Sequence, residues 1–379
     1  MYQDKLGCYR VGDLKVYSKL EAIELHTKTG IHPHWDFNEA VFSSYNWTIE
    51  PTENILELYR QRAQQLREKY DYIILMYSSG SDSHTALQSF MDNDIKLDEV
   101  CSWINYKGTS NKKSYLNEEV YESAIPNIDK LRQTYPWLKH RVIDLTDIIL
   151  DHVGDKTLGY DWIYKINNCF GPNNIARENI VSNVQEWADL VESGKKLCVV
   201  WGKDKPRVHH IDGKFVFRFI DIIDDAASVY SMSGQQPYCD EFFFWTPDLP
   251  KLLIKQAHII KNYLSTSNIQ QLPFVSNQSS GLSYRTIEGQ QYWLSIEGTS
   301  HLVYPNWVEG PVFIPKPITI VIAPRDEWFY PMDDSHLAKR NLVEGLTKIN
   351  QKVSDYWKND PTDFVKGIKG CWSKSYFLE

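Results

Sequence analysis

The residues best suited to chemistry form one short run of small side chains. Ser78-Ser79-Gly80-Ser81-Asp82-Ser83 ends an apolar stretch, YIILMY at 72–77, and a helical pattern starts directly after it. Small residues between a strand and a helix let backbone N–H groups converge without side chains in the way. The N-terminus of the following helix adds partial positive charge, so the segment suits a phosphate group. We call residues 78–83 the small-residue loop.

Two common phosphate-binding patterns do not fit this loop. The Walker A pattern requires a lysine followed by serine or threonine at the start of the helix, and none is present. The dinucleotide-binding pattern requires three glycines, whereas the loop contains only Gly80.

A third pattern does match. The run SSGSDS resembles Ser-Gly-Gly-x-Asp-Ser, the PP-loop of the ATP pyrophosphatase superfamily, which includes GMP, NAD and asparagine synthetases, tRNA thiolation and lysidine enzymes, and phosphoadenylylsulfate (PAPS) reductases. An apolar strand before the loop, a helix after it and a further apolar strand at 99–106 match the context of that motif. Ser79 departs from it, because the superfamily usually has its first glycine there, which leaves altered or lost activity open. The resemblance covers residues 70–205, and the chain as a whole resembles phage-encoded proteins loosely labelled as PAPS-reductase-like.

The resemblance implies a site for ATP and Mg²⁺. Asp82 would orient the loop or help to place Mg²⁺, which offsets the acidic charge beside phosphate. The loop residues that would hold the β and γ phosphates through N–H and hydroxyl groups are Ser78, Ser79, Gly80, Ser81 and Ser83. Trp103, Ile104 and Asn105 follow the second strand, where the superfamily grips adenine with backbone groups, although core packing is an alternative role for Trp103.

A second stretch with chemical potential is WGKDKPRVHH, residues 201–210. It follows an apolar strand at 196–202, and ligands of open α/β sheets bind off the carboxyl ends of such strands. Lys203, Lys205 and Arg207 would direct positive charge toward the phosphates, with Asp204 as a candidate metal partner. Basic residues in an exposed turn are also commonly just solvated. The candidate catalytic residues are Asp82, Ser83 and Lys203, because charge on a leaving pyrophosphate needs cations and N–H groups around it.

A sheet of parallel strands is needed to position these residues. Continuous apolar runs alternate with helical patterns, which predicts a doubly wound, mainly parallel α/β sheet, of the type that the PP-loop resemblance implies. The predicted strands are 72–77, 99–106, 140–145 and 196–202, and the predicted helices are 52–70, 83–92, 117–134 and 174–193.

The remaining chain predicts an extension on each side of this domain. We expect an N-terminal extension at 1–50 with a hairpin at Gly12-Asp13, the nucleotide-binding domain at 51–245, and an α+β region with a tail at 246–379. Expected elements outside the sheet are a type I′ hairpin turn at Asp212-Gly213, a helix that Thr246 caps, a mobile loop at 265–300, a strand at 318–323 and a helix at 336–357. The tail contains Lys374, which predicts that it folds over the nucleotide; packing on the helix at 336–357 is the alternative.

The composition of the chain limits which partners it is expected to bind and which cellular compartment it is expected to occupy. A net charge of −8 and a pI of about 5.8 argue against a surface dedicated to nucleic acid, although a local basic groove stays open. The chain contains no apolar run long enough for a membrane span and no signal-peptide pattern at its start, so we expect a cytoplasmic protein, in the host cytoplasm if it is phage-encoded. The six cysteines form no C-x-x-C pair, which favours buried thiols over a zinc site.

Three functions remain open at this point. The first is an enzyme that cleaves ATP to AMP and pyrophosphate and adenylates an acceptor for amide, amine or sulfur transfer. The second is reductive or sulfur-transfer chemistry like that of the PAPS reductases, whose redox cysteine lies in a Glu-Cys-Gly-(Ile/Leu)-His segment. Cys371 lies in a tail but lacks that glutamate and histidine. The third is a nucleotide-binding or interaction protein without turnover.

Overall fold

The computed structural model describes twelve parts of the chain. They are residues 6–104, 117, 119–154, 180–181, 183–203, 206–221, 238–265, 283–287, 290–294, 301–306, 332–358 and 368–379.

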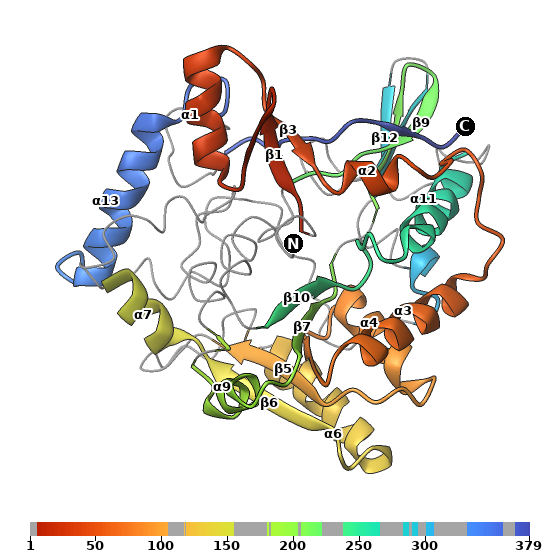
Figure 1. The fold of residues 1–379 in the computed structure, drawn as a ribbon, viewed down its shortest axis with the longest axis vertical. Coiled ribbons are helices and arrows are strands. Elements are labelled where there is room, and N and C mark those ends of the chain that lie inside the picture. Colours follow the sequence, from red (N-terminus) through yellow and green to blue (C-terminus); the bar gives the residue numbers. More distant parts are fainter. Residues whose placement is uncertain are drawn as a thin grey trace.

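A five-stranded parallel sheet forms the centre of the protein, in the order β10-β7-β4-β5-β6 (Figure 1). Helices flank it, so the predicted mixed α/β class with a parallel sheet is confirmed, in a Rossmann-like arrangement. Strand β7 is buried along its whole length, which explains its continuous apolar sequence. The strands are β4 (Tyr72–Met76), β5 (Glu99–Ile104), β6 (Lys139–Asp144), β7 (Leu197–Trp201) and β10 (Cys239–Phe242).

The order of these strands creates a reversal at the middle of the sheet. The chain enters at β4, moves outward through β5 and β6, and then returns to the other side of β4 with β7 and β10. The carboxyl ends of β4 and β7 therefore lie side by side at the point where the order of the strands reverses. In open α/β sheets this switch point is where ligands bind.

Helices cover both faces of the sheet. On one face, Arg62 of α3 donates to the Glu241 carboxylate of β10 at 2.9 Å. On the other face, Trp187 of α9 donates to Glu99 of β5 at 2.8 Å. The helices are α3 (Ile55–Lys69), α4 (Ser81–Met91), the π-helical turn η1 (Val120–Ala124), α6 (Ile125–Thr134), α7 (Thr146–Gly154), α9 (Gln185–Glu192), α11 (Pro250–Leu264) and α13 (Leu337–Lys352).

Two smaller antiparallel sheets lie beyond the central one. Their orders are β2-β1-β3 and β13-β9-β8, and a separate hairpin pairs β11 with β12. Both predicted hairpin turns are confirmed: Gly12-Asp13 joins β1 to β2, and Asp212 and Gly213 have φ values of 50° and 78°, as a type I′ turn requires. The remaining elements are β1 (Cys8–Val11), β2 (Leu14–Val16), α1 (Lys19–Thr29), β3 (His34–Asp36), α2 (Glu39–Phe42), β8 (Val208–Ile211), β9 (Lys214–Phe217), β11 (Ser283–Ile287), β12 (Gln290–Leu294) and β13 (Tyr376–Phe377).

A buried ion pair joins the N-terminal segment to the second small sheet and the tail. Lys19 Nζ lies 2.9 Å from Asp221 Oδ2, and both side chains are at most 1% exposed. Tyr9 donates its hydroxyl to the same Asp221 oxygen, and the Cys371 N–H donates to the other. Segments from three distant parts of the sequence thus share one carboxylate.

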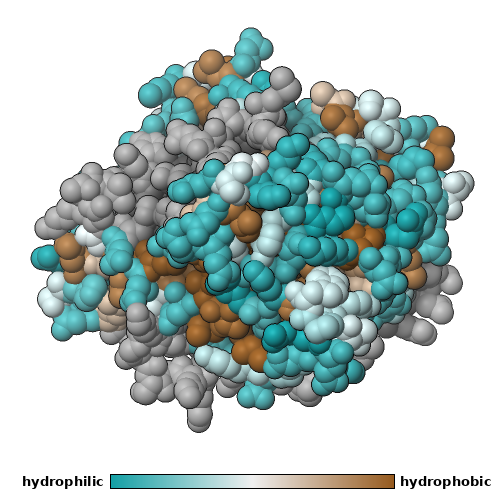
Figure 2. Space-filling view, turned by 60° about the horizontal axis from the view of Figure 1, so that its bottom comes forward, coloured by the Kyte–Doolittle hydropathy of each residue, from teal (hydrophilic) through white to brown (hydrophobic). Residues whose placement is uncertain are grey.

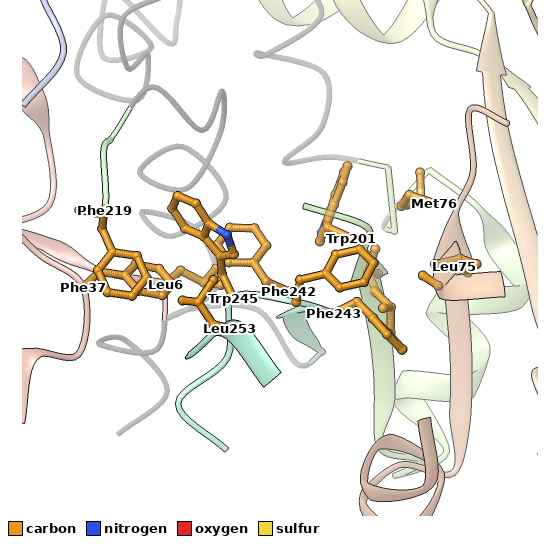
Figure 3. Packing of buried hydrophobic residues seen from close by; sticks show 14 of the residues in the cluster. Leu6, Phe37, Leu75, Met76, Trp201, Phe219, Phe242, Phe243, Trp245 and Leu253 are labelled. Carbon is orange, nitrogen blue, oxygen red and sulfur yellow. The ribbon is translucent and has the colours of Figure 1, made fainter. Parts of the chain in front are cut away.

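One hydrophobic cluster runs from the N-terminal segment into the central sheet. Figure 3 shows this continuity, from Phe37 and Phe219 through Trp245 to Trp201 and Met76. The cluster crosses both boundaries predicted at 50 and 245. On the face shown in Figure 2, hydrophilic side chains predominate and hydrophobic ones form small groups. Across the described parts of the chain, no helix is long and apolar enough to cross a membrane.

The structure corrects three local predictions. Helix α11 begins at Pro250 instead of Thr246, whose hydroxyl accepts from the Asp248 N–H in a turn before the helix. Helix α3 begins at Ile55 instead of residue 52, because Asn54 caps it: the Asn54 side chain accepts from the Leu56 N–H at 2.8 Å. The stretch 265–300, predicted as a mobile loop, contains the β11–β12 hairpin. The predicted strand at 318–323 lies outside the described residues.

Candidate functional site

The small-residue loop lies at the switch point of the central sheet. It leaves the carboxyl end of β4 and passes into α4, whose first helical residue is Ser81. The helix begins two residues earlier than predicted, so Ser81, Asp82 and Ser83 form its first turn. Gly80 is the N-cap and has no side chain to cap the first-turn N–H groups. The arrangement of strand, turn and helix N-terminus is therefore the predicted one.

Two serine hydroxyls hold the ends of the loop together. Ser83 Oγ accepts from the Ser78 N–H at 3.3 Å, and it donates to the Gly80 carbonyl at 3.2 Å. The two hydroxyl oxygens are 3.3 Å apart, and Ser78 Oγ also accepts from the Gly80 N–H. Ser83 is buried whereas Ser78 is exposed. These bonds hold the backbone in one conformation before any ligand binds.

Ser79 adopts a conformation that favours glycine. Its φ is 68°, in the left-handed region that costs a residue with a Cβ atom about 1 kcal/mol or more. Its hydroxyl lies 2.7 Å from that of Ser123 in η1 and accepts from Asn127 Nδ2 in α6 at 2.9 Å. The superfamily's glycine would fit this backbone, and Ser79 holds the same backbone with hydrogen bonds to the neighbouring helix.

Gly202 brings the end of β7 against the first turn of α4. A Cβ atom at this position would lie 2.8 Å from Ser83 Cα and 2.9 Å from Ser83 N, so any other residue would displace backbone. The sequence analysis did not assign Gly202, although a glycine directly after a buried strand is a signal for such close approach. Lys203 follows directly, half-buried, and its N–H donates to the Trp201 carbonyl at 2.9 Å. Asp204 and Lys205 lie outside the described residues.

Two carboxylates approach the loop. Asp82 Oδ1 accepts from the Tyr304 hydroxyl at 2.5 Å. Glu119 Oε1 lies 3.7 Å from the position of a Cβ built at Gly80. Neither Tyr304 nor Glu119 was identified from the sequence, because both come from segments distant from the loop and no local pattern marks them.

An uncharged tyrosine–histidine pair flanks the loop in sequence, with Tyr77 directly before it and His84 directly after it. The Tyr77 hydroxyl lies 2.8 Å from His84 Nδ1. Burial raises the pKa of Tyr77 to about 12 and lowers the pKa of His84. Both side chains are therefore uncharged at pH 7, and neither competes with a cation or an anion at the loop.

The residues predicted to grip adenine lie at the end of β5. The Trp103 ring is half-buried and lies 5.7 Å from the Trp201 ring of β7, on the same face of the sheet. The Leu145 N–H donates to the Ile104 carbonyl at 2.8 Å. Asn105 lies outside the described residues. Packing thus accounts for part of the Trp103 environment, which was the alternative role.

Arg207 belongs to the second small sheet, directly before β8. Its side chain is buried. Burial, Arg218 and Arg207 together lower the pKa of His209 to about 3. Positive charge therefore accumulates on this hairpin, where the sequence placed a candidate phosphate contact.

The tail that contains Lys374 packs away from the loop. Strand β13 pairs with β9, and the Trp35 N–H donates to the Trp372 carbonyl. Lys374 Nζ donates to Ser43 Oγ and lies over the Tyr376 ring. The start of the tail packs against the end of the stretch predicted as a helix at 336–357, because the Lys369 N–H donates to the Trp357 carbonyl at 2.7 Å and Ile368 bridges Lys358, so that alternative is confirmed in part. The rest of the tail lies along the edge of β9, which offers it backbone hydrogen bonds, so the expectation that the tail folds over the nucleotide is corrected.

Cys371 has no environment that would make it reactive. It is buried, its thiol donates to the Pro33 carbonyl at 3.3 Å, and burial raises its pKa well above the ordinary value. All five cysteines of the described residues are free, and four of them are buried, as expected from the sequence.

The chain matches no model of a protein family and no curated protein sequence. Its function must therefore be inferred from the geometry and chemistry of the site.

Proposed function

We propose that the small-residue loop binds the triphosphate of ATP together with Mg²⁺, as the PP-loop resemblance implies. The observation that carries the proposal is the position of the loop at the switch point between β4 and β7, where Gly202 admits the first turn of α4. Phosphate requires converging N–H groups and partial positive charge, and the N-terminus of α4 supplies both. Gly80 adds no side chain of its own to this place, and Gly202 lets β7 approach the Ser83 backbone closely.

The acidic side chains at the loop fit a nucleotide only together with a cation. Asp82 and Glu119 would repel a triphosphate, and a divalent ion between carboxylate and phosphate removes that repulsion. Among the residues that the structure describes, no group of three His, Cys, Asp or Glu side chains could hold a metal ion. Mg²⁺ commonly takes one or two carboxylates plus substrate phosphates. Asp82 is the first candidate, Glu119 the second, and Asp204 remains a prediction.

The proposed reaction is the cleavage of ATP to AMP and pyrophosphate with adenylation of an acceptor. An oxygen of the acceptor bonds to the α phosphorus while the bond to the bridging oxygen of pyrophosphate breaks. Lys203 and the first-turn N–H groups of α4 stabilise the negative charge that develops on the leaving group. Bound Mg²⁺ would add further positive charge to the same oxygens.

The two alternatives differ in what the site must supply. PAPS-reductase-like chemistry requires a reactive thiol, and the burial of Cys371 argues against that residue. A nucleotide-binding protein without turnover requires only the loop, and the altered Ser79 is compatible with it.

Calorimetry with a non-hydrolysable ATP analogue tests the proposal most simply. The wild-type protein should bind the analogue in the presence of Mg²⁺, and Gly80→Leu should lose binding because the new side chain enters the space of the phosphates. Circular dichroism of the variant controls for folding. Unchanged affinity in Gly80→Leu would place the nucleotide elsewhere. AMP and pyrophosphate from ATP would distinguish the enzyme from the binding protein, and Lys203→Ala should slow that reaction by roughly 100-fold.

A further inference from the structure

Residues 301–306 reach the loop from the C-terminal part of the chain. The Tyr304 hydroxyl donates to Asp82 Oδ1 at 2.5 Å, across 222 positions of sequence. On one side of this contact the Tyr59 hydroxyl of α3 donates to the Val303 carbonyl at 2.5 Å. On the other side Gln88 of α4 donates to the Asn306 carbonyl at 3.3 Å. Backbone contacts with two helices therefore fix this short segment.

The Tyr304 hydroxyl is held in place by a packed core. Its side chain is fully buried, and its ring lies 5.2 Å from the Phe244 ring and 6.4 Å from the Tyr59 ring. Tyr59 is fixed in turn, because Gln256 of α11 donates to its hydroxyl at 3.0 Å. Because the packed ring fixes the Tyr304 hydroxyl, the hydrogen bond forms only when the Asp82 carboxylate is oriented toward it.

This contact decides where Asp82 points. An aspartate in the first turn of a helix gains by turning its carboxylate to the N–H groups of that turn, which are the groups proposed to bind phosphate. A hydrogen bond between a buried hydroxyl and an ionised carboxylate is among the stronger ones in proteins. It anchors Oδ1 on the side of residues 301–306.

We propose that Tyr304 is a positioning residue of the nucleotide site, which holds Asp82 in the orientation that accepts Mg²⁺ and leaves the loop N–H groups to phosphate. The proposal rests on the proposed function. It makes the C-terminal part of the chain a component of the site, although that part lies outside the PP-loop resemblance.

Removal of the hydroxyl alone separates positioning from packing. Tyr304→Phe keeps the buried ring and removes only the donor to Asp82. Tyr9→Phe is the matched control, because it is another fully buried tyrosine whose hydroxyl donates to a carboxylate, that of Asp221 instead of Asp82. Asp82→Asn and the double variant Asp82→Asn/Tyr304→Phe complete a cycle. Thermal unfolding of every variant reports packing separately.

Calorimetry of the ATP analogue over a range of Mg²⁺ concentrations is the measurement. Tyr304→Phe should weaken Mg²⁺-dependent binding by about tenfold, whereas Tyr9→Phe should leave the Mg²⁺ dependence unchanged even if it lowers the melting temperature. In the Asp82→Asn background, Tyr304→Phe should have little further effect on affinity.

Three results would overturn the inference. Wild-type affinity and Mg²⁺ dependence in Tyr304→Phe would show that the hydroxyl only packs. An equal loss in the Asp82→Asn background would show that Tyr304 acts independently of Asp82. Wild-type Mg²⁺ dependence in Asp82→Asn would show that Asp82 does not bind Mg²⁺, and so would refute the positioning role of Tyr304 even if Tyr304→Phe did not fold. Failure of the wild-type protein to bind the analogue would instead refute the proposed function itself.

Discussion

At the scale of single residues, Ser79 shows how the loop accommodates serine where the PP-loop pattern has glycine. A serine in the left-handed region is strained, but its hydroxyl contacts two polar side chains of the η1–α6 segment. Strain and hydrogen bonding are each of order 1 kcal/mol, so they offset one another. The hydrogen bonds from the η1–α6 segment therefore help to stabilise the conformation of the loop.

Two substitutions of Ser79 separate these effects. Ser79→Ala keeps the strained backbone and loses the hydrogen bonds, so it should lower the free energy of unfolding by about 1 to 3 kcal/mol. Ser79→Gly loses the same bonds but relieves the strain, so it should be the more stable of the two. Urea denaturation of both variants tests this order. An alanine variant as stable as wild type would show that the hydroxyl contacts contribute nothing.

Asp240 makes the free energy of unfolding depend on pH. It is buried beside the loop strands, its carboxylate accepts from Trp201 Nε1 at 2.8 Å, and burial raises its pKa to about 7. The unfolded chain releases this proton near pH 4, so the native state holds one more proton between about pH 4 and 7. The free energy of unfolding therefore falls as pH rises through this range and levels off above it.

Asp240→Asn should remove this pH dependence, because asparagine cannot ionise and still offers Oδ1 to Trp201. Relative to wild type, the variant should gain about 2 to 4 kcal/mol of stability between pH 4.5 and pH 8. Urea denaturation of both proteins at several pH values measures the difference. A difference that stays constant with pH would mean that Asp240 ionises as it does in the unfolded chain.

At the scale of elements, the tail behaves as a strand and not as a lid. Its β13 segment pairs with β9, and Cys371, Tyr376 and Leu378 are buried. Truncation after Gly367 should therefore lower the melting temperature, since it removes several buried side chains at about 1.5 to 3 kcal/mol each.

Lys374→Ala provides the companion test, because it leaves the strand in place. It should leave affinity for the ATP analogue within about twofold of wild type, since Lys374 contacts Ser43 and Tyr376. A truncated protein that keeps its melting temperature but no longer binds nucleotide would support the original prediction that the tail folds over the nucleotide.

At the scale of the whole molecule, we expect the terminal segments and the central sheet to unfold as one cooperative unit. The Lys19–Asp221 pair is buried, and a single hydrophobic cluster extends from it into the sheet. Removal of one partner from a buried pair leaves an uncompensated charge, which typically costs about 3 to 5 kcal/mol.

Lys19→Met should therefore lower the free energy of unfolding by about 3 to 5 kcal/mol while unfolding stays a single transition. The double variant Lys19→Met/Asp221→Asn should recover part of this loss, because it buries no unpaired charge. Denaturation followed by fluorescence and circular dichroism measures both. Two separate transitions would show that the N-terminal segment and the sheet unfold independently.

The sequence predicted those features that depend on local pattern. Continuous apolar runs marked β4 and β7, and small residues between strand and helix marked the loop. Contacts between distant segments left no such signal: nothing around Tyr304 or Glu119 indicates that either approaches the loop. The tail was misplaced because one lysine was paired with an assumed anion, whereas the free edge of β9 determined where the tail binds.

The phosphates are proposed to bind where β7 meets the first turn of α4, and Gly202→Ala is the sharpest test of that position. A methyl group there would press on Ser83 backbone atoms, whereas one at Gly154 meets nothing within 4 Å, so Gly154→Ala is the control. We predict that calorimetry with Mg²⁺ and the ATP analogue will show binding to wild type and Gly154→Ala, and a loss of about tenfold or more in Gly202→Ala. Equal affinity in all three proteins, or no binding to any of them, would contradict this position of the phosphates.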